Sequence, residues 1–222
     1  MAEVTKAKSK IDELKDNLEA MKPEFEKVLP RHIPFDRFER TVLTACRMRP
    51  ELLDADRQSF WTACLRAAQD GLMPDGRLGV INIYRKNFGT REKPEWKPVC
   101  QWMPMVAGYC QKARQSGEIS TLDAQAIYAN DQYDAWVDEK GPHFIFRPKL
   151  KERGELVGAF AYVITKDAAL FFEQMTLEEI KAVESVSKAS EGPWKGPFKG
   201  EMIRKTPLRR LLKYRVPSST DI

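Results

Sequence analysis

The sequence predicts an α+β fold in which helices and strands are segregated along the chain. Apolar residues recur at helical spacing over roughly the first 70 residues and again beyond residue 176. Between about residues 78 and 175, short β-prone runs alternate with turn residues, and one helical segment interrupts them. We therefore expect a helical N-terminal part, an antiparallel sheet with an inserted helix, and basic helices at the C-terminal end.

The composition is typical of a globular protein without membrane-spanning segments. Of its 222 residues 42% are hydrophobic and 31% are charged, which is ordinary for a globular domain. We expect no membrane span, because no apolar run reaches about 18 residues, and no signal peptide. The four cysteines fit neither a zinc spacing nor a compact disulfide framework, so we expect free thiols in a cytoplasmic protein.

An apolar stripe at heptad-like spacing predicts two N-terminal helices. It consists of Ile11, Leu14, Leu18, Met21, Phe25 and Val28. Pro23 interrupts the pattern, which predicts one helix to about Lys22 and a short one beginning at Pro23. We expect residues 1–30 to form an arm and residues 31–222 the α+β core. The arm packs either on its own domain or on a neighbouring subunit, and the sequence favours neither.

Two core-forming helices are expected next. Asp36 followed by Glu39 resembles a capping box, and this helix should run to about Arg47. The second begins near Asp56 and ends at Gly71, a residue suited to the position after a helix.

The middle of the chain reads as strands around one helix. Trp102 lies on the second strand, where core packing is the favoured role. A helix then starts at Thr176, with Glu179 at the reciprocal capping position, and should run to about Lys188. The expected strands are 78–84, 98–105, 119–128, 136–137, 144–147, 155–164 and 169–175, and the inserted helix is 106–115.

The most basic stretch is a helix near the end of the chain. From Lys195 to Arg215 there are eight Lys/Arg and one acid, a net charge of +7 against +5 for the whole chain. On a helix its cations and its leucines fall on opposite arcs, which suggests a polyanion partner. Cations in a last helical turn also complement the helix dipole, so charge alone does not decide the function. The cations are Lys205, Arg209, Arg210 and Lys213, and the leucines are Leu208, Leu211 and Leu212.

Motifs for nucleotide or metal chemistry are missing from the sequence. There is neither a Walker-type phosphate loop nor a Gly-x-Gly-x-x-Gly run, and two histidines supply no paired-histidine site. We expect no cofactor and no metal. One enzymatic alternative is a magnesium-dependent nuclease that uses Asp123, Asp131 and Asp134, which are expected near strand ends.

Five segments in order resemble the phage RecT recombinases, over roughly residues 25 to 218. Two of them lie in the C-terminal third, and the last covers most of the basic helix. The segments are Leu29–His32, Gln69–Pro74, Gly108–Ile119, Ser187–Trp194 and Glu201–Tyr214.

The resemblance implies a single-strand annealing protein of homologous recombination that works without ATP. It implies a bent antiparallel sheet in a Rad52-like core, and rings or helical filaments that hold single-stranded DNA and the annealed duplex. A phage exonuclease is the implied partner. The alternative of a single-strand-binding module that does not anneal stays open.

On this interpretation we expect the DNA backbone to be bound by cations from two helices. They are Lys112, Arg114, Lys205, Arg209, Arg210 and Lys213. Tyr84, Tyr109 and Trp194 are candidates for stacking on bases, and Trp194 is expected in an exposed loop. Pro207 predicts a kink in the basic helix, or a fresh start with Thr206 as its N-cap.

Overall fold

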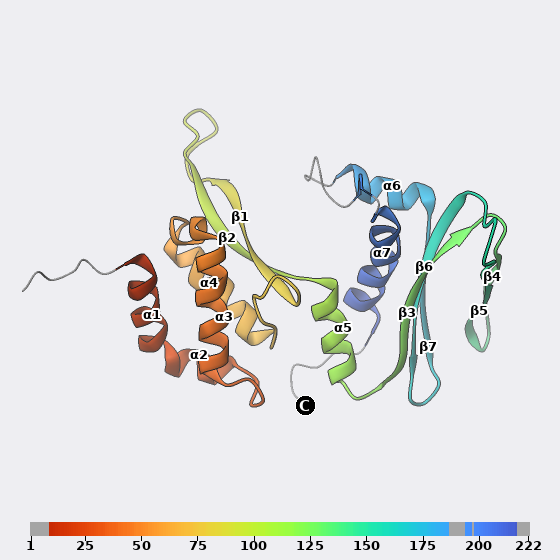
Figure 1. Ribbon diagram of the computed structural model, residues 1–222, viewed down its shortest axis with the longest axis horizontal. Coiled ribbons are helices and arrows are strands. Elements are labelled where there is room, and N and C mark those ends of the chain that lie inside the picture. Colours follow the sequence, from red (N-terminus) through yellow and green to blue (C-terminus); the bar gives the residue numbers. More distant parts are fainter. Residues whose placement is uncertain (1–8, 187–193, 197, 217–222) are drawn as a thin grey trace, which may run out of the picture. The chain divides into compact units, whose positions relative to one another are not determined.

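Helices and antiparallel strands are segregated along the chain as the sequence predicts (Figure 1). The computed structural model describes residues 9–186, 194–196 and 198–216. The chain divides between Gln111 and Lys112 into two compact units. The division falls within α5 (Val106–Gln115), the predicted inserted helix. Among the described residues no helix is both long enough and apolar enough to cross a membrane.

The first unit packs its helices around one core. Leu14, Leu18 and Phe25 of the predicted stripe are buried in it. An N-terminal arm reaching a neighbouring subunit would therefore have to use the exposed faces of α1 and α2. The helical elements of this unit are α1 (Lys10–Ala20), α2 (Lys22–Val28), α3 (Phe35–Met48), the 3₁₀ turn η1 (Pro50–Leu53) and α4 (Arg57–Gln69).

The start of α3 differs from the predicted capping box. Pro34 occupies the N-cap with extended backbone angles (φ −64°, ψ 140°), so the helix begins at Phe35 and Asp36 lies inside its first turn. Glu39 makes no reciprocal cap. Its side chain is buried, its Oε1 has no hydrogen-bond partner among the described residues, and burial raises the pKa of its carboxyl.

The end of α4 follows the prediction. Gly71 has a positive φ of 62°, a conformation that glycine adopts without a Cβ clash. The Leu72 amide donates to the Ala67 carbonyl (3.1 Å) and the Gly71 amide to the Ala68 carbonyl (3.0 Å). This pairing is a Schellman motif, and it satisfies two of the carbonyls that a helix end leaves without partners.

A long antiparallel hairpin completes the first unit. It pairs β1 (Gly79–Asn87) with β2 (Trp96–Pro104), and Figure 1 shows it extending beyond the helices. β1 continues three residues and β2 two residues into residues 85–97, the segment between the two predicted strands. Trp102 is buried and its indole N–H donates to Asp70 Oδ2 (2.8 Å), which confirms its role in the core.

The second unit contains a three-stranded antiparallel sheet and a separate hairpin. The order in the sheet is β3-β6-β7, formed by Ile119–Tyr128, Leu156–Thr165 and Leu170–Thr176. The hairpin pairs β4 (Gln132–Asp138) with β5 (Gly141–Arg147). The predicted antiparallel pairing is therefore confirmed, and the strands of the chain are divided among three sheets rather than joined in one.

Aromatic rings join the hairpin to the sheet. Phe144 of β5 stacks on Phe172 of β7 with a centroid distance of 5.3 Å, and Tyr133 of β4 stacks on Phe160 of β6 at the same distance. Residues two apart on a strand share a face, so these rings can form one layer between hairpin and sheet.

Two helices follow the sheet. α6 (Leu177–Ser185) begins with the predicted capping box, in which Thr176 accepts from the Glu179 amide and the Glu179 carboxylate accepts from the Thr176 amide. The helix ends about three residues before the predicted position. The basic helix is α7 (Lys199–Tyr214), which packs on all three strands of the β3-β6-β7 sheet.

Candidate nucleic-acid interface

Helix α7 is held to the sheet by one apolar stripe. Ile203, Pro207 and Leu211 recur every four residues and are buried, as is Leu212. Leu208 is only half-buried. The predicted division into an apolar and a basic arc is thus correct for most of the helix, and the apolar arc fixes the direction in which the cations project.

Pro207 lies inside a continuous helix, so the predicted restart at Thr206 is wrong. The N-cap position is Phe198, and Thr206 is an interior residue. Its hydroxyl donates to the Met202 carbonyl (2.8 Å), a bond within the helix that leaves it unable to act as a cap. Pro207 itself has no N–H to donate to the preceding turn, but its ring fills part of the buried stripe.

The four predicted cations of α7 line one pocket of about 640 Å³. Lys205, Arg209, Arg210 and Lys213 therefore form a single surface, which we call the α7 cation cluster. The remaining lining comes from the same unit and is mainly apolar. It consists of Met175, Val183, Val186, Trp194, Met202, Thr206 and Tyr214.

Lys205 differs from the other cations in its burial. Its side chain is partly buried, and burial together with the neighbouring Arg209 charge lowers the pKa of its ammonium group. A phosphate beside Lys205 would favour the charged form and reverse this shift. Arg209 and Lys213 are exposed, and no carboxylate among the described residues is within ion-pair distance of either. These two side chains are the ones most available to an anion.

Arg210 already has acidic partners. Its Nε lies 3.1 Å from Oε1 of Glu173 and its Nη1 lies 3.5 Å from Oε1 of Glu179. Glu173 is buried, and Arg215 approaches its other oxygen at 3.5 Å. A buried carboxylate requires such partners, so Arg210 stabilises the packing of α7 on β7 as well as lining the pocket.

Trp194 is not the exposed aromatic that the sequence suggests. It is 6% exposed and packs with Met175, Ile180 and Ile203 in a small core. Flanking glycine and proline residues predict a loop, but they do not report whether the ring turns inward. Stacking on a base would require the ring to leave this core.

An aromatic side chain that we had not singled out lies beside the cation cluster. Tyr214 lines the pocket, is 71% exposed, and lies under the Lys213 ammonium group, which is 5.0 Å from its ring centroid. Its position next to a lysine in the last turn of the basic helix is the feature of the sequence from which it could have been predicted. An exposed ring with a cation over one face can stack on a base or support a phosphate contact.

The other predicted contact residues do not line this pocket. Tyr84 on β1 and Tyr109 on α5 belong to the first unit and are half-buried. Lys112 and Arg114 belong to the second unit, in the last turn of α5, where Arg114 is exposed and Lys112 is half-buried. The α7 cation cluster is therefore the set of predicted residues that the structure brings together.

Two carboxylates of the nuclease alternative, those of Asp131 and Asp123, have other partners. Asp131 has a fully buried side chain, and its oxygens accept from Arg153 Nη2 (2.5 Å), Arg153 Nε (3.0 Å) and two backbone amides. Asp123 lies in the middle of β3, not near a strand end as expected, and accepts from Gln125 (2.8 Å). In the part of the chain that the structure describes, no three His, Cys, Asp or Glu side chains are grouped to hold a metal ion.

Comparison with known proteins adds information about both units. The model of the RecT family matches residues 36–221. Protein RecT of Escherichia coli (strain K12) is 34% identical over 209 residues, which cover 93% of this chain and 75% of that protein. The match to the family model includes α5 and the whole of α7.

Proposed function

This chain belongs to the RecT family of recombination-associated single-strand annealing proteins, and from that premise we propose that it assembles on single-stranded DNA through α7 and pairs complementary strands without ATP. The observation that carries the proposal is the α7 cation cluster. Four side chains that are spread over nine residues of sequence line one pocket, and three of them have no acidic partner among the described residues.

The cluster is suited to a sugar–phosphate backbone. Each single-strand phosphate that is neutralised contributes about 0.7 to the slope of log K against log salt. Contacts to phosphate carry no sequence information and leave the base edges accessible. Homology is then tested by Watson–Crick pairing, and the protein supplies affinity and alignment.

Within the cluster we assign different roles to the four cations. Arg209 and Lys213 are the phosphate ligands, and Lys205 is a third whose partial burial places it nearer the floor of the pocket. Arg210 contributes charge while it holds Glu173. Tyr214 replaces Trp194 as the aromatic candidate beside the backbone. Lys112 and Arg114 of α5, with Tyr84 and Tyr109, remain proposed contacts.

We also propose that subunits assemble into rings or filaments in the bacterial cytoplasm and act with a phage exonuclease that exposes single strands. In an oligomer the weak backbone-binding sites of neighbouring subunits bind the same DNA strand together, which raises the overall affinity. Every added subunit stabilises a newly paired duplex by mass action.

A strand-pairing assay tests the proposal. Two complementary oligonucleotides with a donor and an acceptor dye are added in sequence to the full chain, without nucleotide and with or without magnesium. We expect energy transfer faster than spontaneous pairing, full-length DNA on a gel, and large assemblies in the electron microscope. Shortened DNA would favour the nuclease, and coating without faster pairing would favour a non-annealing binding module.

A further inference from the structure

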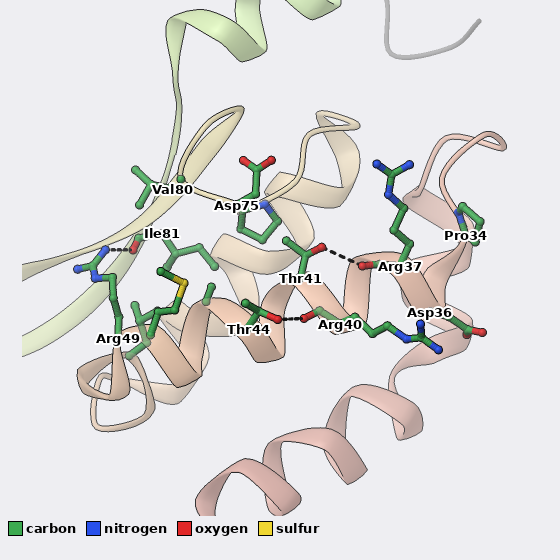
Figure 2. A pocket seen from close by; sticks show the side chains of 15 residues that line it. Pro34, Asp36, Arg37, Arg40, Thr41, Thr44, Arg49, Asp75, Val80 and Ile81 are labelled. Carbon is green, nitrogen blue, oxygen red and sulfur yellow. Dashed lines mark hydrogen bonds between the residues drawn. The ribbon is translucent and has the colours of Figure 1, made fainter.

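A second concave surface lies in the first unit, against α3. Figure 2 shows this groove, which has a volume of about 750 Å³. One wall is the outer face of α3, and the other is formed by Val80 and Ile81 of β1 and by the turn around Asp75. All of its lining residues lie between Pro34 and Ile81, so the groove is independent of the α7 cation cluster.

The floor of the groove is apolar because the hydroxyls of its threonines donate to backbone carbonyls of α3 itself. Thr41 Oγ1 donates to the Arg37 carbonyl (2.9 Å) and Thr44 Oγ1 to the Arg40 carbonyl (2.8 Å), as the dashed lines in Figure 2 show. Their hydrogen-bonding capacity is therefore used within the helix. Met48 adds a side chain that is 78% exposed, and a flexible thioether adapts to apolar partners of different shapes.

The charges at the rim of the groove are unevenly compensated. Asp36 has Lys22 at 3.7 Å, and Asp75 accepts from the backbone amides of Arg77 (2.8 Å) and Leu78 (2.7 Å). Arg37 and Arg40, which are exposed and about one turn apart, have no ion-pair partner among the described residues. The two arginines outweigh Asp75, so the rim charge that lacks an ion-pair partner among the described residues is net positive.

One end of the groove is fixed by a third arginine. Arg49 donates from Nη1 to the Ile81 carbonyl (3.0 Å), and its Nε lies 2.9 Å from Oε1 of Glu51. The bond to the Ile81 carbonyl holds the C-terminal end of α3 against β1, and the contact with Glu51 fixes the arginine itself. The groove is thus a preformed feature whose walls are tied together, which lowers the cost of ordering it on binding.

These properties favour a peptide over a nucleic acid. The lining contains no Phe, Tyr, Trp or His on which a base could stack, and two carboxylates lie at its rim. A phosphate would use the arginines but not the apolar floor. An amphipathic helix with acidic flanks would use both, which is a known mode of peptide recognition.

We propose that this groove docks an acidic amphipathic helix of a partner protein, with its apolar side chains between α3 and β1 and its carboxylates on Arg37 and Arg40. The probe is a fluorescein-labelled helical peptide of about 15 residues, with leucines at i, i+3, i+4 and i+7 and glutamates beside them. Its anisotropy is measured with the full chain. Two further peptides replace the glutamates by lysine or the leucines by serine.

We expect saturable binding of the acidic amphipathic peptide alone. The double variant Arg37→Glu/Arg40→Glu should weaken it by about tenfold or more, since two attractive contacts become repulsive. The matched control Arg31→Glu/Arg66→Glu reverses two exposed arginines that do not line the groove, and it should bind like the parent. Met48→Ser, at an exposed position, should weaken binding through lost apolar contact without unfolding the chain.

Four results would overturn the proposal. The first is the absence of saturable binding up to about 1 mM peptide. The second is a loss of peptide affinity in the control variant equal to that in Arg37→Glu/Arg40→Glu. The third is displacement of the peptide by an oligo(dT) competitor. The fourth is a lower light-scattering mass of Arg37→Glu/Arg40→Glu than of the control, which would assign the groove to contacts between copies of this chain.

Discussion

Replacing Arg209 and Lys213 by alanine should remove two phosphate contacts per subunit and leave the fold intact. Both side chains are exposed and neither takes part in an ion pair among the described residues. Each single-strand phosphate contact contributes about 0.7 to the salt slope, so the double variant should lose about 1.4. Between 50 and 200 mM salt, affinity of the parent should then fall about sevenfold more than that of the variant.

The measurement is fluorescence anisotropy of a labelled oligo(dT) over that range of salt. The matched control is Arg147→Ala/Lys166→Ala, which removes two exposed cations of the same unit that do not line the pocket. We expect the control to keep the slope of the parent. An unchanged slope in Arg209→Ala/Lys213→Ala, or an equal change in the control, would refute the assignment of the α7 cation cluster to the DNA backbone.

Three further predictions concern stability and reactivity. Arg210→Ala should lower the free energy of unfolding by about 1–3 kcal/mol, because it leaves the buried Glu173 with one partner. The control Arg209→Ala should leave the free energy of unfolding unchanged, and urea denaturation measures it for both variants. Hydrogen bonds from Arg153 lower the pKa of Asp131, so its contribution to stability is complete above a pH of about 4 and is lost as the pH falls through the lowered pKa. Asp131→Asn should therefore be less stable at neutral pH and lose less stability on acidification, and a thermal melting series from pH 7 to about pH 2 that gave parallel curves would contradict this. All four cysteines are buried, and burial raises the pKa of Cys46 to about 12, so alkylation at a pH of about 8 should be slow until the chain is unfolded; rapid labelling of the native protein would disprove this.

Local signals in the sequence were sufficient for most helix and strand positions. The capping box of Thr176 and Glu179 and the glycine at position 71 mark helix ends through bonds made within four or five residues. The β-prone run at residues 119–128, bounded by turn residues, predicts β3 with its observed bounds.

Local signals failed where two patterns competed. Asp36 and Glu39 have capping-box spacing, but Pro34 is the N-cap, so α3 starts two residues earlier, and the Glu39 side chain is buried. Thr206 before Pro207 looks like a helix start, but the buried stripe from Ile203 to Leu211 keeps the helix continuous. In both cases tertiary packing of one helix face outweighs a capping preference of about 1 kcal/mol.

The sequence by itself determined the α+β class, the order of the elements, the basic arc of α7 and the membership of the RecT family, since each depends on residue type and spacing along the chain. Only the tertiary structure decided which of the candidate residues meet. In the folded chain Trp194 is buried and Arg210 forms an ion pair with Glu173. Arg209, Lys213 and Tyr214 are exposed on the surface. Burial and pairing are set by contacts between segments far apart in sequence, and a helical pattern fixes the face on which a side chain lies but not what lies opposite it.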